Sequence, residues 1–350
     1  MIFTSDNASG AAPEILDAVT RASDGYTRGY GADETTERVE ELVRDVFEAP
    51  SARVFTVATG TAANALALAC LCPPWSTVFC HDVSHVEVDE CGAPEFFTGG
   101  AKLTLLDGEH ARLRPSELER RVSMAGALGV HNVQAGAISL TQATERGAIY
   151  PLDEISKVAG IARRHGIGLH MDGTRFANAL ARLGCTPAEM SWKAGVDILC
   201  LGATKNGALA AETVILFDPD RAWEFELRRK RSGHLFSKMR FVSAQVEAYL
   251  TDDLWLRLAN HSNAMADRLA SGIAAIDGAT VINPVEANIL FVAMRLDQHR
   301  RLQAAGAQYY SENLDLDENG PDDGPWEARL VTSFQTSEAD VDRFLEVMAG

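Results

Sequence analysis

Lysine is scarce in this chain, and basic residues as a class are outnumbered by acidic ones. The 350 residues include 32 Lys+Arg and 49 Asp+Glu, which gives a formal net charge of -17. A surface this acidic repels nucleic acid and anionic membranes, so we expect neither as a partner. An anionic small molecule would have to be held by a local cluster of hydrogen-bond donors.

Uninterrupted apolar runs and paired cysteine motifs are also missing. The apolar stretch from Val54 to Leu71 is broken by polar residues and a glycine, so it does not predict a membrane span. The first residues do not form a charged-then-apolar leader. The six cysteines form no zinc-type CxxC pair. We therefore predict reduced thiols in a cytoplasmic protein, with no dedicated metal site.

The chain does contain a regular alternation of short apolar runs and amphipathic stretches. Such alternation predicts an α/β fold with a mainly parallel seven-stranded sheet and helices on both faces. One of the predicted helices is Pro187–Ala194, which has proline in its first turn. The expected strands are Arg53–Ala58, Thr77–His81, Lys102–Leu106, Gly136–Thr141, Gly168–Met171, Asp197–Gly202 and Thr213–Phe217.

The pattern changes after Phe217. Residues 221–277 favour almost continuous helix, and a mixture of strands and helices follows. We therefore predict a large domain over residues 1–250, the N-terminal segment included, and a small C-terminal α+β domain over residues 251–350.

Lys205 is one of only six lysines, and it follows the apolar strand that ends at Gly202. Open α/β sheets place ligands at the carboxyl ends of their strands. Burial lowers the pKa of a lysine and makes its amine nucleophilic, as a Schiff base requires. Taken alone, the pattern fits equally well a lysine whose stem covers the end of a strand.

Asp172 strengthens the case because it also ends an apolar strand, 33 residues earlier. A carboxylate there can pair with a protonated pyridine nitrogen and keep the ring an electron sink. The alternative is a helix N-cap. A third segment, Thr59-Gly60-Thr61, joins a strand to a helix, where free backbone N–H groups and hydroxyls can bind phosphate. By itself the Thr59-Gly60-Thr61 segment also fits a simple turn that caps a helix.

Over nearly its whole length the sequence resembles the threonine aldolases, pyridoxal-phosphate (PLP) enzymes of fold type I. The resemblance rests on segments that occur in the family's order. They are Ser5-Asp6-Asn7, Tyr30-Gly31-Ala32-Asp33-Glu34, the Thr59-Gly60-Thr61 turn, Asp172-Gly173-Thr174-Arg175 with Asn178, and Arg329-Leu330-Val331-Thr332.

The resemblance implies a role for each matching residue. Lys205 would carry PLP covalently, and Asp172 would pair with the ring nitrogen. His85 would stack on the ring and take part in proton transfer. Thr59, Gly60 and Thr61 would bind the phosphate. Arg175 would contact the ring hydroxyl or the substrate.

Further matches concern the substrate and the neighbouring subunit. Ser5 and Arg329 would hold the substrate carboxylate, and His131 would lie near its hydroxyl. The base that removes the hydroxyl proton stays open between His85, His131 and a water held between them. Tyr30 and Arg175 would also contact the substrate, and Lys230 and Arg240 would contact the cofactor. The resemblance implies a homotetramer, a dimer of dimers with active sites at subunit contacts, in which Tyr30, Lys230 and Arg240 face a neighbouring subunit.

The implied activity is a lyase reaction that splits L-threonine, L-allo-threonine or a related β-hydroxy-α-amino acid, such as phenylserine, into glycine and an aldehyde. One departure leaves substrate preference and stereochemistry open, because the family's Glu-Asn-Thr-His segment is replaced by Thr141-Gln142-Ala143-Thr144. The alternatives are another fold-type-I PLP enzyme (a β-eliminating lyase, an aminotransferase or a serine hydroxymethyltransferase-like enzyme) and a scaffold without activity.

Overall fold

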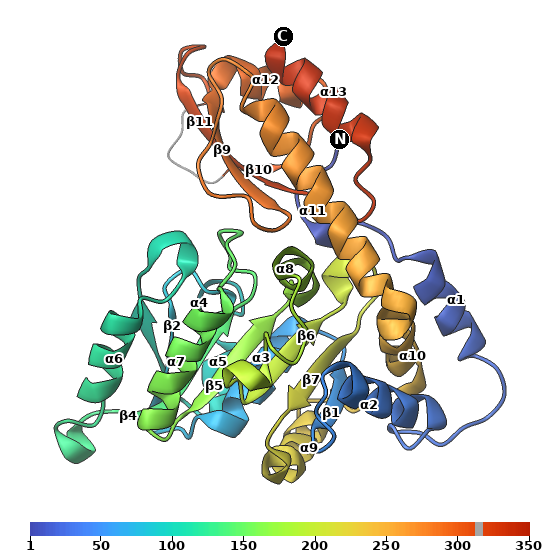
Figure 1. Cartoon of the computed structure of the whole chain (residues 1–350), viewed down its shortest axis with the longest axis vertical. Coiled ribbons are helices and arrows are strands. Elements are labelled where there is room, and N and C mark those ends of the chain that lie inside the picture. Colours follow the sequence, from blue (N-terminus) through green and yellow to red (C-terminus); the bar gives the residue numbers. More distant parts are fainter. Residues whose placement is uncertain (312–317) are drawn as a thin grey trace.

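Two β-sheets, one in each of two lobes, organise the molecule (Figure 1). The computed structural model describes residues 1–311 and 318–350. The large lobe holds a seven-stranded sheet of order β1-β7-β6-β5-β4-β2-β3. Its strands are β1 Arg53–Val57, β2 Ser76–His81, β3 Lys102–Leu106, β4 Gln134–Thr141, β5 Gly168–Gly173, β6 Ile198–Gly202 and β7 Glu212–Leu216.

The predicted mainly parallel sheet is confirmed. Strands β3, β2, β4, β5 and β6 run parallel to one another, whereas β7 is antiparallel to both β6 and β1. The carboxyl ends of β4, β5 and β6 therefore lie at one edge of the sheet, and this edge faces the small lobe (Figure 1).

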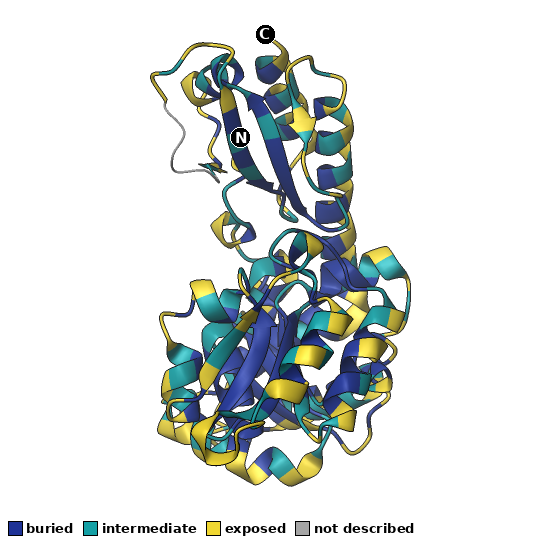
Figure 2. Ribbon diagram, turned by 90° about the vertical axis from the view of Figure 1, so that its left-hand side faces the viewer, coloured by how far each residue is buried: buried dark blue, intermediate teal, exposed yellow. Residues whose placement is uncertain are grey.

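Helices cover both faces of this sheet, so its central strands are buried (Figure 2). Helices α3 and α9 contribute to the apolar core on one face, and α2, α6, α7, α8 and α10 to the core on the other. The helices of the large lobe are α1 Pro13–Arg21, α2 Glu34–Val46, α3 Gly60–Leu71, α4 His85–Val88, α5 Ala93–Thr98, α6 Pro115–Met124, α7 Leu152–Arg164, α8 Phe176–Leu183, α9 Ala222–Arg231 and α10 Arg240–Leu250.

The predicted helix Pro187–Ala194 is wrong. This segment forms hydrogen-bonded turns followed by the short 3-10 helix Trp192–Ala194. Two buried side chains, Met190 and Ala194, hold it against the large core, and the Trp192 indole donates to the carbonyl of Phe47 at 2.8 Å. Tertiary packing thus outweighs the helical preference of so short a segment.

The small lobe is built on a four-stranded sheet of order β10-β11-β9-β8. Phe3 packs in its core, so the chain begins in this lobe and then crosses to the large one. Its elements are α11 Leu254–Ile273, β8 Thr280–Val281, β9 Ile289–Arg295, α12 Leu296–Ala304, β10 Tyr310–Ser311, β11 Pro325–Val331 and α13 Glu338–Ala349.

Helix α11 connects the two lobes (Figure 1). Its first turns contribute Leu254, Trp255 and Ala259 to the core of the large lobe, and its last turns contribute Leu269 and Ile273 to that of the small lobe. A domain boundary after residue 250 stays a prediction. Among the described residues, none of the helices is long and apolar enough to span a lipid bilayer.

Candidate active site

Asp172 and Lys205 lie at the ends of two adjacent parallel strands. Asp172 of β5 pairs with Cys200 of β6, and Lys205 follows the end of β6 by three residues. At Gly202 a Cβ atom would lie 2.6 Å from the carbonyl oxygen of Thr174, a distance that only glycine allows. The backbone after Asp172 can therefore approach the strand that leads to Lys205.

The turn that carries Lys205 is firmly anchored. The side-chain amide of Asn206 donates to the Tyr249 hydroxyl and to the Trp255 carbonyl, both at 2.9 Å. Gly207 completes the turn with φ 106°, a conformation that favours glycine. Burial lowers the pKa of Lys205, and the positive charge of Arg175 lowers it further. Lys205 is thus held in place and is easier to deprotonate than an exposed lysine.

Asp172 is kept ionised by its surroundings. Burial raises the pKa of a carboxyl group, but the charge of His85 and the hydrogen bonds from Thr174 outweigh it, so the pKa of Asp172 is lowered. Thr174 donates through its backbone N–H at 2.9 Å and its hydroxyl at 2.7 Å, and Asn64 donates at 2.9 Å. A buried carboxylate held this way can stabilise a cationic ring nitrogen.

His85 is paired with Glu90. Its Nδ1 lies 2.9 Å from Oε1 of Glu90, which also accepts a 2.8 Å hydrogen bond from Asn64. This hydrogen bond raises the pKa of His85 despite partial burial, whereas burial raises the pKa of Glu90. Ligand atoms of His85, Glu90 and Asp172 lie within 4.8 Å of one another. These three side chains already take part in hydrogen bonds. The absence of a dedicated metal site stays a prediction.

Two cavities adjoin at Lys205, and both are lined by Asn7, His85 and Lys205. The smaller cavity, of about 220 Å³, is further lined by Ala58, Thr59, Gly60, Thr61, Asn64, Thr174, Thr204 and Glu212. The other, of about 370 Å³, is further lined by Ser5, Val83, Val88, Asp89, Glu145, Arg146, Arg175, Ile289, Phe291 and Arg329.

The Thr-Gly-Thr turn forms one wall of the smaller cavity at the N-terminus of α3. Thr59 is the N-cap of this helix, and its hydroxyl accepts a 3.2 Å hydrogen bond from the N–H of Ala62. Gly60 and Thr61 follow as the first helical residues. The N–H groups of a first helical turn lack partners within the helix, so this wall suits a phosphate group.

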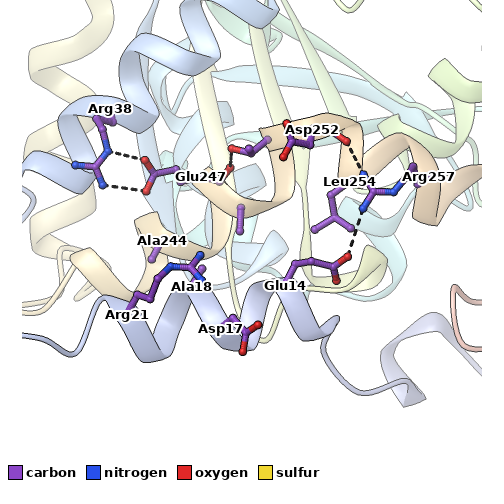
Figure 3. A pocket seen from close by; sticks show the side chains of 12 residues that line it. Glu14, Asp17, Ala18, Arg21, Arg38, Ala244, Glu247, Asp252, Leu254 and Arg257 are labelled. Carbon is purple, nitrogen blue, oxygen red and sulfur yellow. Dashed lines mark hydrogen bonds and ion pairs between the residues drawn. The ribbon is translucent and has the colours of Figure 1, made fainter.

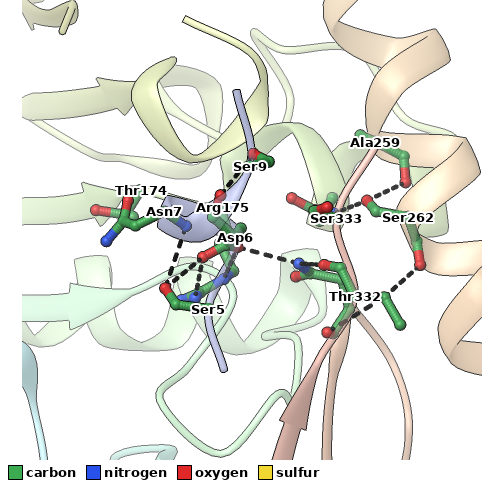
Figure 4. Close-up of polar contacts among 12 residues, drawn as sticks. Ser5, Asp6, Asn7, Ser9, Thr174, Arg175, Ala259, Ser262, Thr332 and Ser333 are labelled. Carbon is green, nitrogen blue, oxygen red and sulfur yellow. Dashed lines mark hydrogen bonds and ion pairs between the residues drawn. The ribbon is translucent and has the colours of Figure 1, made fainter. Parts of the chain in front are cut away.

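Arg175 is held by the N-terminal segment (Figure 4). Asp6 is 1% exposed and accepts two hydrogen bonds of 2.9 Å from Arg175. Ser5, next to it, caps the short 3-10 helix Asp6–Ala8. From β11, Arg329 lines the same cavity and donates to the carbonyl of Thr4 at 3.4 Å. The cavity thus combines the guanidinium groups of Arg146, Arg175 and Arg329 with the hydroxyl of Ser5.

His131 does not line these cavities within the same chain, and its predicted place beside a substrate hydroxyl stays a prediction. It is exposed on the 3-10 helix Gly129–His131, before β4 begins. Residues that precede a parallel strand lie at the edge of the sheet opposite to those that follow it. His131 is therefore at the opposite end of β4 from the Lys205 cavities of its own chain.

Tyr30, Lys230 and Arg240 also lie outside the two cavities. The ammonium group of Lys230 lies 4.6 Å from the centre of the Tyr30 ring. Tyr30 is 55% exposed, and Arg240 donates to the carbonyls of Asp24 and Gly25. Their predicted part in a site shared with a neighbouring subunit stays a prediction.

A further cavity, of about 510 Å³, lies between α1 and α10 (Figure 3). Its charges are largely matched, since Arg38 pairs with Glu247 and Arg257 with Glu14. None of the predicted site residues lines it. The chemistry predicted from the sequence therefore gathers at Lys205.

The residues that line the Lys205 cavities include several that sequence reasoning missed. Asn7 belongs to a segment that carried the resemblance, and Asn64 follows the Thr59-Gly60-Thr61 turn by three residues, so both lie close to predicted site residues in the sequence. Glu145 and Glu212 carried no signal of their own. Burial raises the pKa of Glu212 to about 7 beside Lys205.

Comparisons with known proteins agree with this geometry. Residues 3–297 match the model of the beta-eliminating lyase family. The chain is 42% identical to a low specificity L-threonine aldolase of Pseudomonas aeruginosa over 345 residues, which cover 99% of this chain and 95% of that one. The structure of a Leishmania major threonine aldolase matches with a TM-score of 0.91 at 28% identity, covering 99% and 98% of the two chains.

A more distant match shows that the fold alone does not select a reaction. A Sphingomonas wittichii serine palmitoyltransferase matches with a TM-score of 0.72 at 15% identity, covering 100% of this chain and 86% of that one. At this identity the likeness concerns the fold only. The reaction must be argued from the side chains at the cavities.

Proposed function

Because this chain belongs to the beta-eliminating lyase family and, within it, to the threonine aldolases, we propose that it cleaves β-hydroxy-α-amino acids with the help of PLP. Threonine and allo-threonine are the substrates we expect, and glycine and an aldehyde are the products. The observation that carries the proposal is the shared wall of the two cavities, where Asn7, His85 and Lys205 face both. A cofactor in one cavity could thus react with a substrate in the other.

The donor set of the smaller cavity fits PLP. When bound, PLP supplies an imine carbon and a pyridinium ring that accepts the electron pair of a broken bond at Cα. Lys205 would hold it covalently, and its lowered pKa makes the amine easier to deprotonate than that of an exposed lysine. Asp172, itself kept ionised, would keep the ring nitrogen protonated. Thr59, Gly60 and Thr61 would bind the phosphate.

The larger cavity fits an amino-acid substrate. Arg329, Arg175 and Ser5 would bind the substrate carboxylate, for which a guanidinium group provides parallel N–H donors. Arg329 reaches the cavity from β11 and Arg175 is oriented by two hydrogen bonds to Asp6, so we assign the carboxylate contact to both guanidinium groups. An apolar β-substituent would contact Val83, Val88, Ile289 and Phe291.

His85 would cover one face of the cofactor ring. Its Nδ1 is tied to Glu90, which fixes the orientation of the imidazole and raises its pKa. A ring held in one orientation excludes water from the reacting face and can retain a proton there. His85 thus serves as a rigid wall and as a proton carrier.

Assembly and location complete the proposal. We place Tyr30, Lys230 and Arg240 at a subunit contact of a homotetramer, since Lys230 and Tyr30 meet outside the cavities. The abundance of free cysteines, most of them buried, supports a cytoplasmic location. Sedimentation of the PLP-loaded protein tests the assembly: a tetramer is expected, and a monomer would contradict it.

A product assay tests the function. The protein is reconstituted with PLP, and L-threonine and L-allo-threonine are added separately. We expect glycine and acetaldehyde in equal amounts, with neither ammonia nor a keto acid. Ammonia with a keto acid would indicate elimination, and a keto acid formed by amino transfer would indicate an aminotransferase. A colourless protein that cannot be loaded with PLP would indicate a scaffold.

A further inference from the structure

The cavity that would hold the substrate contains a carboxylic acid with no role so far. Glu145 lies in the turn after β4 and lines the same cavity as Lys205 and Arg329. His131 lies at the opposite edge of the same chain's sheet, so we looked among the side chains that line this cavity for a group that could bind the substrate's β-hydroxyl. Glu145 is a titratable residue of this cavity that reaches it from the carboxyl end of a sheet strand.

The carboxyl group of Glu145 is fixed by one of its oxygens. Its Oε1 accepts a 2.9 Å hydrogen bond from the backbone N–H of His85 and a 2.7 Å hydrogen bond from the Thr141 hydroxyl. Its Oε2 is buried and has no hydrogen-bond partner among the described residues. A buried oxygen without a partner is costly, so a ligand that supplies a hydroxyl donor would be favoured there.

The backbone around Glu145 is also constrained. Gly147 has φ 76°, and a Cβ atom there would lie 2.8 Å from the carbonyl oxygen of Ile289. The N–H of Gly147 donates to the carbonyl of Thr144 at 2.9 Å. The turn therefore packs closely against β9, whose residues Ile289 and Phe291 line the same cavity.

The electrostatics of the cavity favour Glu145 over His85 as a proton acceptor. Burial raises the pKa of Glu145, and the negative charge of Asp172 raises it further. The Nδ1 atom of His85 is already engaged by Glu90, and this hydrogen bond raises the pKa of His85. A base is most effective when its pKa lies near the working pH, which burial brings about for a carboxylate.

We propose that Glu145 is a catalytic residue, which binds the β-hydroxyl of the substrate and takes its proton as the Cα–Cβ bond breaks. The inference rests on the proposed function, because it needs a substrate anchored at Arg329 and Lys205. A substrate held between these two residues has its β-carbon in the cavity that Glu145 lines.

The step balances as follows. The hydroxyl proton moves to the Glu145 carboxylate, and the O–H electron pair forms the carbonyl bond of the departing aldehyde. The Cα–Cβ electron pair would remain with the glycine fragment, for which bound PLP would supply the electron sink. A proton is then added at Cα, and Glu145 returns its proton to solvent. No oxidant or reductant is required.

The test compares two reactions of the same loaded enzyme. Threonine cleavage needs a group that removes the proton of the substrate's β-hydroxyl. Exchange of the α-proton of glycine with D2O needs the cofactor and Lys205, but glycine has no β-hydroxyl, so this reaction does not need that group. In Glu145→Gln we expect kcat for cleavage to fall by roughly 10²–10⁴-fold, the usual share of a general base, while exchange changes by less than about threefold. PLP absorbance and thermal unfolding should stay those of the wild type.

Two further variants make the result decisive. Glu145→Asp keeps the carboxylate but shortens it, so it should cleave threonine faster than Glu145→Gln and exchange normally. Glu87→Gln, which removes a carboxylate from the same short helix as His85 without touching the cavity, should match the wild type in both reactions.

Full cleavage by Glu145→Gln overturns the proposal. A parallel loss of cleavage and exchange in both Glu145 variants also overturns it, because that result indicates a structural role. Failure of the wild type to exchange or cleave would instead overturn the proposed function.

Discussion

Arg175 donates two hydrogen bonds of 2.9 Å to the two carboxylate oxygens of Asp6, a residue 169 positions earlier in the chain. Both side chains are nearly buried, at 11% and 2% exposure. The contact joins the N-terminal segment to the end of β5, where Asp172 lies. It thereby brings Ser5 and Asn7 to the wall of the Lys205 cavities.

The first prediction concerns this pair. Burial raises the pKa of Asp6, but Arg175 and Lys205 outweigh it, so the folded pKa lies below the ordinary 3.8. The contribution of Asp6 to the free energy of unfolding is therefore present above pH 3.8, and it is lost as the pH falls through the folded pKa of Asp6. In Asp6→Asn the buried charge of Arg175 has no carboxylate partner at Asp6. We therefore expect the free energy of unfolding to fall by about 3 kcal/mol at pH 7, and by less in acid.

Urea unfolding of the cofactor-free protein measures this loss. Asp17→Asn is the control, because Asp17 is exposed on α1. Equal stability of the two variants at pH 7 would show that the Asp6–Arg175 contact does not anchor the N-terminal segment.

The second prediction concerns the His85–Glu90 pair. The hydrogen bond that His85 donates to the Glu90 carboxylate raises the pKa of His85 above 6.5. The contribution of this pair to the stability of the fold is therefore fully present below pH 6.5, and it is lost as the pH rises through the folded pKa of His85. In Glu90→Gln the imidazole of His85 should titrate at lower pH, as NMR of the cofactor-free protein can measure. An unchanged titration, equal to that of Glu87→Gln, would contradict the pairing.

The third prediction separates helix capping from phosphate binding. Thr59 caps α3 beside the smaller cavity, and Ser337 caps α13 in the other lobe. Removing either cap by substitution with alanine should cost about 1 kcal/mol of stability. Only Thr59→Ala should weaken PLP binding, by roughly tenfold for one lost hydrogen bond to a charged group. Absorbance titration with PLP measures this, and equal affinities would remove Thr59 from the phosphate site.

The fourth prediction follows from the place of His131, exposed before β4. His131→Ala should keep the kcat and KM of the wild type, because its side chain lies away from both cavities. A fall in kcat measured at the wild-type oligomeric state would mean that His131 reaches a neighbouring subunit's site.

The sequence was sufficient to predict where residues at the ends of strands lie. Lys205 and Asp172 could be placed together because adjacent parallel strands bring their carboxyl ends to one edge. Glu145 could not be placed, since its orientation depends on a turn that packs against β9, more than 140 residues later in the chain. The place of His131 relative to this chain's own cavities depends on which end of β4 it adjoins, and a short sequence motif does not carry that information. The predicted helix at Pro187–Ala194 failed because burial of Met190 and Ala194 favours a tighter path.

The central claim is that Lys205 carries the cofactor, and it can be tested directly. The PLP-loaded protein is treated with borohydride, which converts an imine into a stable amine, and the digested peptides are weighed by mass spectrometry. The phosphopyridoxyl group should be found on Lys205 and be lost in Lys205→Ala. Its attachment to any of the other five lysines, or to none, would contradict the account.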